Sequence, residues 1–233
     1  MKNFYLFLIT IFATSLGFGQ TVFINEIHYD NDGSDTGEGV EIAGPAGTDL
    51  STYTITAYNG NGGASYSTTS LSGTIPDLSG TGYGTLFFPI ANLQNGAPDG
   101  LALDDDGTLI QFLSYEGSFT ATDGVANGVT STDIGVSESG TAAIGTSLQL
   151  GGTGTTYTDF SWNASASSTY DAFNNGQTFS GGAPSPSIGF DAATSTENET
   201  NTTFTSSNIP ITVSNYDGNQ IDIDVNVTGG TAE

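Results

Sequence analysis

Short runs in which apolar and polar residues alternate cover most of the chain after residue 20. In one of them Tyr53, Ile55 and Ala57 alternate with threonines, and the turn-forming residues 59–62 (NGNG) end the run. Alternation with a period of two puts apolar side chains on one face of a strand, so this run predicts a half-buried strand. Further short strands are predicted at residues 84–90, 146–150, 157–162 and 177–180, and no window predicts a helix.

A hairpin is predicted over residues 101–114. Leu101–Leu103 and Thr108–Ser114 are strand-like runs, and the sequence DDDG at residues 104–107 joins them. Asp-Gly is a preferred dipeptide in tight hairpin turns. Pro89 puts the 84–90 strand at a sheet edge, or marks its end, because proline has no N–H to donate to a neighbouring strand. Many short strands with glycine turns and no helix predict an all-β fold, a β-sandwich.

The first twenty residues have the composition of a secretory signal peptide. Lys2 precedes an uncharged, mainly apolar run at residues 4–19, which is short for a membrane span and is followed by no basic residues. We expect cleavage near Gly19-Gln20 or Gln20-Thr21, a secreted or cell-surface location, and no membrane span in the cleaved chain. The alternatives are an uncleaved anchor or a buried N-terminal helix.

A segment rich in Gly, Pro and Ser at residues 181–187 predicts a linker between two parts of the chain. Residues 21–180 before it make up the predicted sandwich. Residues 188–233 after it alternate again, first at Ile209, Ile211 and Val213 and then from Ile221 onward. About three strands cannot close a sandwich. We therefore expect 188–233 to be the incomplete start of a second sandwich in a longer protein; the alternative is that its strands pack onto the first domain.

The charge balance excludes several kinds of chemistry. The 233 residues include one Lys+Arg against 25 Asp+Glu, for a formal net charge of -24, and no Cys. Without its first twenty residues the chain has no Lys or Arg, so it cannot bind nucleic-acid phosphates through basic side chains or form a Lys Schiff base. The absence of Cys excludes disulfides, thiol nucleophiles and Cys-ligated metals. The strong acidity favours contact with hard cations.

The densest group of acidic residues begins at residue 30 with the sequence DNDGSD. Asp30, Asp32, Asp35 and Glu38 offer oxygen ligands close together, and Gly33 permits a tight bend. This combination is typical of Ca²⁺ sites, so these four residues form the candidate calcium site. The spacing does not match an EF-hand, which requires glycine at the sixth position. The alternative interpretation is a solvated turn between two strands.

His28 is the only histidine, and therefore the only side chain that titrates near neutrality without a shift. Glu26 and Asp30 lie two residues to either side of it, so all three could share a strand face and hold zinc. The alternative is a structural histidine at a strand end. No G-x-S-x-G elbow occurs, and pairs of carboxylates drawn from so many acids carry no information about glycoside hydrolysis. The residues therefore assign no catalytic side chain and no cofactor other than calcium.

Several motifs, in order, resemble those of the lamin tail domain. They are Ile24–Ile27 (INEI), Glu38–Ile42 (EGVEI), Thr48–Ile55 (TDLSTYTI) and Asp99–Phe112. The resemblance covers about residues 22–180. Within the family, this region is most similar to the long version found in secreted bacterial proteins. It departs at Gly39, where an aromatic residue is usual, and at Thr52-Tyr53, where Gly-Trp is usual. The resemblance implies an immunoglobulin-like sandwich without a known catalytic centre.

The C-terminal segment, with Phe190-Asp191, Glu197 and the run from Ile209 to Glu233, is similar to the start of a Calx-beta domain. Some members of that family bind Ca²⁺ through acidic residues, and Glu197 is the one position here that matches such a ligand.

These observations predict a non-catalytic exported β-sandwich module that serves binding, adhesion or spacing in a larger secreted or cell-surface bacterial protein. Its expected partner is an extracellular protein or polysaccharide, and not a nucleic acid. One alternative is an accessory module of an extracellular nuclease or other hydrolase whose catalytic domain lies beyond residue 233. Another alternative is an adhesin stabilised by calcium.

Overall fold

The computed structural model describes residues 20–180, 187–190 and 211–214. Their regular structure is β-strand, apart from one 3₁₀ turn, η1 (Tyr157–Asp159), and turns and loops join the strands. The strands are β1 (Phe23–His28), β2 (Gly39–Pro45), β3 (Tyr53–Asn59), β4 (Ala64–Ser70), β5 (Tyr83–Pro89), β6 (Asp99–Asp105), β7 (Thr108–Tyr115), β8 (Thr132–Asp133), β9 (Thr146–Gly154), β10 (Phe160–Ser167), β11 (Gln177–Phe179), β12 (Ser187–Phe190) and β13 (Ile211–Ser214). The predicted all-β fold is confirmed.

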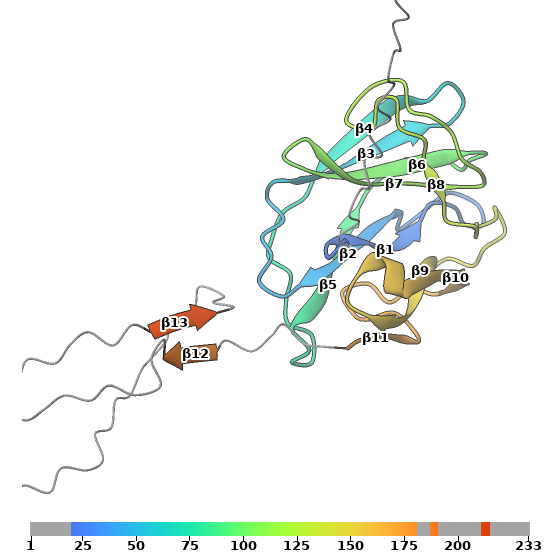
Figure 1. The fold of residues 1–233 in the computed structure, drawn as a ribbon. Coiled ribbons are helices and arrows are strands. Elements are labelled where there is room, and N and C mark those ends of the chain that lie inside the picture. The colour runs from blue at the N-terminus through green and yellow to red at the C-terminus, as the bar shows by residue number, and fades with distance from the viewer. Residues whose placement is uncertain (1–19, 181–186, 191–210, 215–233) are drawn as a thin grey trace, which may run out of the picture.

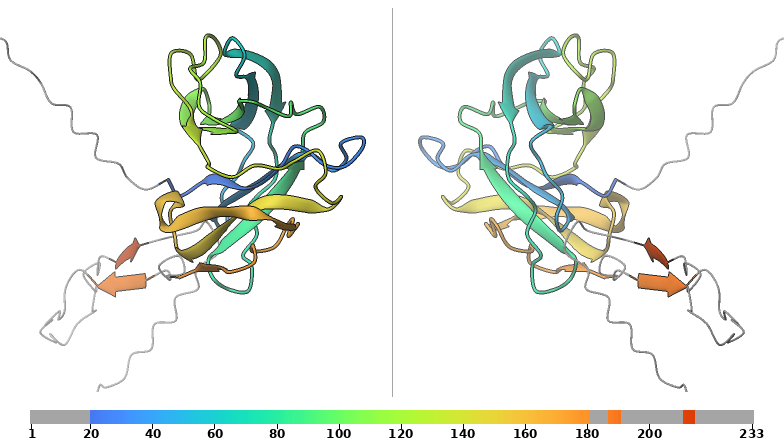
Figure 2. Two further views of the ribbon diagram at one scale, coloured as in Figure 1. Left: turned by 90° about the vertical axis from the view of Figure 1, so that its right-hand side faces the viewer. Right: turned by 90° about the vertical axis from the view of Figure 1, so that its left-hand side faces the viewer.

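Two sheets stack on each other in a β-sandwich-like arrangement (Figures 1 and 2). One has the strand order β10-β9-β1-β2-β5, with β11 parallel to β9, and the other has the order β4-β3-β6-β7-β8. Ile27 and Ile42 from the first sheet share one buried cluster with Ile55, Leu101 and Leu103 from the second. The main core therefore lies between the sheets, as in an immunoglobulin-like domain.

The outer faces of both sheets carry buried apolar residues as well. Phe23, Leu150 and Phe179 form a second cluster outside the first sheet. Tyr58 and Phe112 form a third outside the second sheet, where they pack with alanines of the loop between β7 and β8. Every residue of β1 is buried for this reason, including its polar ones.

The predicted hairpin is present as β6 and β7. Its turn residues Asp106 and Gly107 both have positive φ, at 45° and 78°, which is the geometry of a two-residue turn that follows the twist of the strands. β5 ends at Pro89 and lies at the edge of its sheet, as the proline indicated.

The predicted strand at 157–162 is placed differently in the structure. Residues Tyr157–Asp159 form η1, and β10 starts at Phe160. The carboxylate of Asp159 accepts hydrogen bonds from the backbone N–H groups of Thr155 and Thr156, at 2.9 and 2.8 Å. These local bonds stabilise a tight turn in place of the first half of the strand.

β12 and β13 pair antiparallel, with Ile188 opposite Val213. The expected signal peptide lies outside the described residues apart from Gln20, as do most of the expected linker and most of the second domain. Among the residues that the structure does describe, no helix has the length and apolar character needed to cross a membrane.

Candidate functional site

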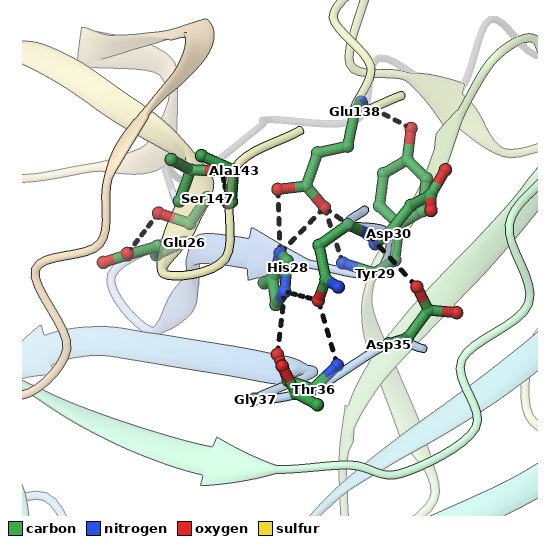
Figure 3. A network of polar contacts seen from close by, with 12 residues as sticks. Glu26, His28, Tyr29, Asp30, Asp35, Thr36, Gly37, Glu138, Ala143 and Ser147 are labelled. Carbon is green, nitrogen blue, oxygen red and sulfur yellow. Dashed lines mark hydrogen bonds and ion pairs between the residues drawn. The ribbon is translucent and has the colours of Figure 1, made fainter. Parts of the chain in front are cut away.

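His28 ends β1 and is held at both ring nitrogens (Figure 3). Nδ1 lies 2.9 Å from the Oε1 atom of Glu138, and Nε2 lies 3.2 Å from the Asn31 Oδ1 atom and 3.1 Å from the carbonyl oxygen of Thr36. All of these neighbours are hydrogen-bond acceptors, which suits a ring protonated on both nitrogens. His28 is only 1% exposed, so its ring is closed off from solvent.

Glu138 is the buried partner of His28 and comes from the loop between β8 and β9. Its carboxylate also accepts hydrogen bonds from the backbone N–H groups of Tyr29 and Asp30, at 2.7 and 3.0 Å. Its own N–H donates to the hydroxyl of Tyr29, and that hydroxyl donates to Glu116. The carboxylate of Glu138 is thus fully bonded inside the protein and is not free to act on a substrate.

Two opposing effects act on the pKa of His28. Burial on its own would lower the pKa, because it disfavours the charged ring. The hydrogen bond and the negative charge of Glu138 act the other way, and the net result is a pKa above the ordinary value of 6.5. The ion pair therefore persists to a higher pH than an exposed histidine would allow.

The four residues of the predicted calcium site are only partly brought together. Asp30 and Glu38 are buried, whereas the side chain of Asp32 is exposed. Asp35 accepts hydrogen bonds from the backbone N–H of Asn31 at 3.1 Å and from the side chain of Asn95 at 3.2 Å. In the described part of the chain, no three His, Asp or Glu side chains are placed so that they could hold a metal ion.

One feature of this loop does favour a cation. The Oε2 atom of Glu38 accepts from the N–H of Asn92 at 2.8 Å, whereas its Oε1 atom is buried and has no hydrogen-bond partner among the described residues. Burial raises the pKa of Glu38, and the negative charge of Asp35 raises it further. The pKa of Asp30 is likewise raised by burial and then by Asp35. Negative charge is therefore concentrated here, and the nearby His28, whose charge lowers the pKa of Glu38, is itself paired with Glu138.

The possible zinc-binding group of His28, Glu26 and Asp30 is not formed. The carboxylate of Glu26 instead accepts hydrogen bonds from the hydroxyl of Ser147 at 2.5 Å and from the N–H of Thr169 at 3.0 Å. His28 has Glu138 as its carboxylate partner. Sequence reasoning did not identify Glu138, because it lies 110 residues from His28 and its own neighbours carry no recognisable signal.

A second buried network surrounds two carboxylates that the sequence analysis did not single out as a pair. Glu26 on β1 lies opposite Glu41 on β2, and both side chains are 0% exposed. The side chain of Asn25 donates to Glu41 at 2.9 Å, and the N–H of Asp171 donates to it at 2.6 Å. An acidic residue next to apolar residues in each strand was the available signal, but only the strand register shows that the two acids are neighbours.

The environment of this pair disfavours negative charge. Burial raises the pKa of Glu41 to about 8, with a smaller contribution from the charge of Glu26, while the hydrogen bond from Asn25 acts in the opposite direction. The pKa of Glu26 is also raised by burial. A protonated carboxyl at neutral pH resembles a general acid, but the segment that contains Thr169 and Asp171 covers the pair and leaves no room for a substrate.

Comparisons with protein-family models, with curated proteins and with solved structures found no match to this chain. The resemblance to lamin tail and Calx-beta domains therefore remains a prediction from the sequence.

Proposed function

We propose that this chain is a non-catalytic, exported β-sandwich module that serves binding, adhesion or spacing outside the cell. One observation carries the proposal. The described groups best suited to acid–base chemistry are His28, Glu138, Glu26 and Glu41, and each is at most 4% exposed. They bond to one another and to covering loops, as internal polar groups that stabilise a fold do.

The test is an assay of the purified chain against nuclease, glycosidase and esterase substrates between pH 5 and 9. We expect no turnover above that of a buffer blank. Turnover that Glu138→Gln or Glu26→Gln abolishes, in protein shown to be folded by circular dichroism, would make these groups catalytic and overturn the proposal. Asp77→Asn, which changes an exposed carboxylate, is the matched control.

A second candidate function is calcium-dependent stabilisation of the same module, as in an adhesin. It is favoured by the unpartnered Oε1 atom of Glu38 and by the nearby charge of Asp35. Calcium takes backbone carbonyl and water oxygens as well as carboxylates, so two carboxylates could form part of a site. Asp30 and Asp32 would then contribute only after the loop rearranges.

This candidate is tested by thermal unfolding of the full chain in EDTA and then in millimolar Ca²⁺ or Mg²⁺. A ligand that binds only the native state stabilises it by about 2.7 kcal/mol at a hundredfold excess over Kd. We expect a saturable rise in Tm with Ca²⁺ that is lost in Asp35→Asn/Glu38→Gln and kept in Asp77→Asn. An equal rise with Mg²⁺, or a rise that survives the double substitution, would reject the site.

A further inference from the structure

A groove of about 550 Å³ lies beside the second sheet, between β7 and the η1 segment. Its lining includes Gln20, Ile110, Gln111, Val129, Thr132 and Tyr157. None of these side chains is charged, although the chain has 25 acidic residues. The lining thus combines hydroxyl, amide and apolar groups in an otherwise strongly acidic protein.

The floor of the groove is a strand edge that is only partly used. β7 pairs with β6 along its length, but on its other side β8 pairs only with Leu113 and Ser114. No described strand pairs with that side of residues 108–112; instead the side chain of Gln20 donates a hydrogen bond to the carbonyl of Ile110. Unpaired strand edges accept an additional strand readily, because their N–H and C=O groups already point outward.

The wall of the groove carries an exposed apolar residue. Val129 in the groove wall is 40% exposed, and only one other large hydrophobic residue in the described part of the chain, Ile144, is classed as exposed. An apolar side chain thus lies next to unpaired backbone groups of a strand. Extended peptides bind to sheet edges through this combination of groups.

The charge around the groove indicates what the peptide should carry. Three exposed acidic side chains lie close in sequence to residues that line the groove. Asp106 lies in the turn before β7, Asp133 follows Thr132, and Asp159 follows Thr158. The chain as a whole carries a net charge of -24, so a second copy would meet strong repulsion there. A partner with basic residues on either side of an uncharged centre would be attracted.

We propose that the free edge of β7 binds an extended segment of another protein as an added strand, with β-branched or apolar residues at its centre and Lys or Arg at its ends. This inference rests on the proposed function as a binding module and specifies its partner class. Backbone pairing along residues 108–112, in which the peptide replaces the side chain of Gln20 at the carbonyl of Ile110, would supply affinity. The contact with Val129 and the acidic flanks would supply selectivity.

The test uses the full chain and fluorescein-labelled decapeptides with alternating Val and Thr at the centre and two Lys at each end. We expect saturable binding by fluorescence polarisation. Affinity should fall at least tenfold when the flanking Lys are replaced by Glu, or when Pro replaces two central residues and removes their N–H donors. Binding should also slow hydrogen exchange of β7 amides over residues 108–112.

Val129→Asp should weaken peptide binding at least tenfold, because it adds charge to the apolar wall. Ile144→Asp is the matched control, since it makes the same change at the other exposed apolar residue, and it should leave the affinity unchanged. Equal affinity for the Glu-flanked or Pro-containing peptides, an unchanged affinity in Val129→Asp, or no peptide binding at all would overturn strand addition. None of these outcomes affects the non-catalytic proposal, which depends on the turnover assay alone.

Discussion

At the residue scale, His28 shows how neighbours decide the charge of a buried group. Both of its nitrogens face acceptors, and Glu138 supplies the opposite charge. A histidine with a raised pKa contributes stability below its ordinary pKa of 6.5, and this contribution is lost as the pH rises through the higher folded value. His28 thus stabilises the loop after β1 most strongly in mildly acidic solution.

Glu138→Gln should lower the pKa of His28 below 6.5, because burial would then act without the opposing charge. The amide can still accept from the N–H groups of Tyr29 and Asp30 and donate to the imidazole, so the fold should be retained. An NMR titration of the one imidazole in the chain measures the pKa directly. Glu116→Gln, which changes the partner of the Tyr29 hydroxyl, should have a much smaller effect. A pKa that stays above 6.5 in Glu138→Gln would show that the ion pair is not its cause.

At the element scale, strand pairing brings two carboxylates, Glu26 and Glu41, together in the protein interior. β1 and β2 place Glu26 opposite Glu41 beside a register shift at Asn25, and the segment after β10 then covers both acids. In the unfolded chain Glu41 would ionise at its ordinary pKa of 4.5, whereas in the folded chain it keeps its proton until about pH 8. Since the folded state binds the extra proton, stability falls as the pH rises across this window.

The free energy of unfolding should therefore decrease between pH 5 and pH 8, by roughly 3 to 4 kcal/mol if Glu41 alone were responsible. Glu26→Gln should reduce the decrease, because it removes one of the charges that raise the pKa of Glu41. Guanidinium unfolding at pH 5, 6.5 and 8 measures this. Asp49→Asn, at an exposed carboxylate, should keep the slope of the native protein. Parallel slopes for the native protein and Glu26→Gln would contradict the proposed coupling.

Close packing at strand ends gives a second prediction at this scale. A Cβ atom added to Gly84 on β5 would lie 1.8 Å from the carbonyl oxygen of Pro76, whereas one added to Gly140 would meet nothing closer than 3.8 Å. Gly84→Ala should therefore lower the free energy of unfolding by about 2 kcal/mol or more, and Gly140→Ala should change it by less than about 0.5 kcal/mol. Urea unfolding of both variants tests this, and equal stabilities would show that the contact at Pro76 relaxes freely.

At the scale of the whole molecule, charge imbalance opposes compactness. A net charge of -24 is unrelieved by any Lys or Arg beyond Lys2, so the folded state concentrates repulsion that the unfolded chain can spread out. Salt screens such repulsion, with a Debye length that falls from about 30 Å at 0.01 M to about 3 Å at 1 M.

The Tm should accordingly rise by at least ~2 °C, equivalent to roughly 1 kcal/mol for a domain of this size, between 20 and 500 mM NaCl at pH 7. The measurement is made in EDTA so that bound calcium does not contribute. Choline chloride should act equally, because screening does not depend on the cation. A rise seen with NaCl alone would indicate specific Na⁺ binding, and a fall in Tm would contradict the repulsion argument.

The sequence by itself determined the all-β class, the β6–β7 hairpin and the edge position of β5. Each of these follows from local rules: two-residue alternation, an Asp-Gly turn and a proline that cannot donate. The same rules missed β4, whose residues ASYSTTS are mostly polar and partly exposed. β4 is a strand because it pairs with β3, and its sequence has no apolar alternation that a local rule could detect.

Only the tertiary structure decided which polar residues meet. Glu138 lies 110 residues from its partner His28 in the sequence. Thr169 lies 143 residues from Glu26, and the pairing of β1 with β2 makes Glu41 a neighbour of Glu26. Alternation assigns a residue to a face of a strand, but it does not specify which loop later covers that face. The partners of buried polar groups are therefore set by long-range packing, because a buried donor, acceptor or charge is tolerated only where distant segments complete its hydrogen bonds.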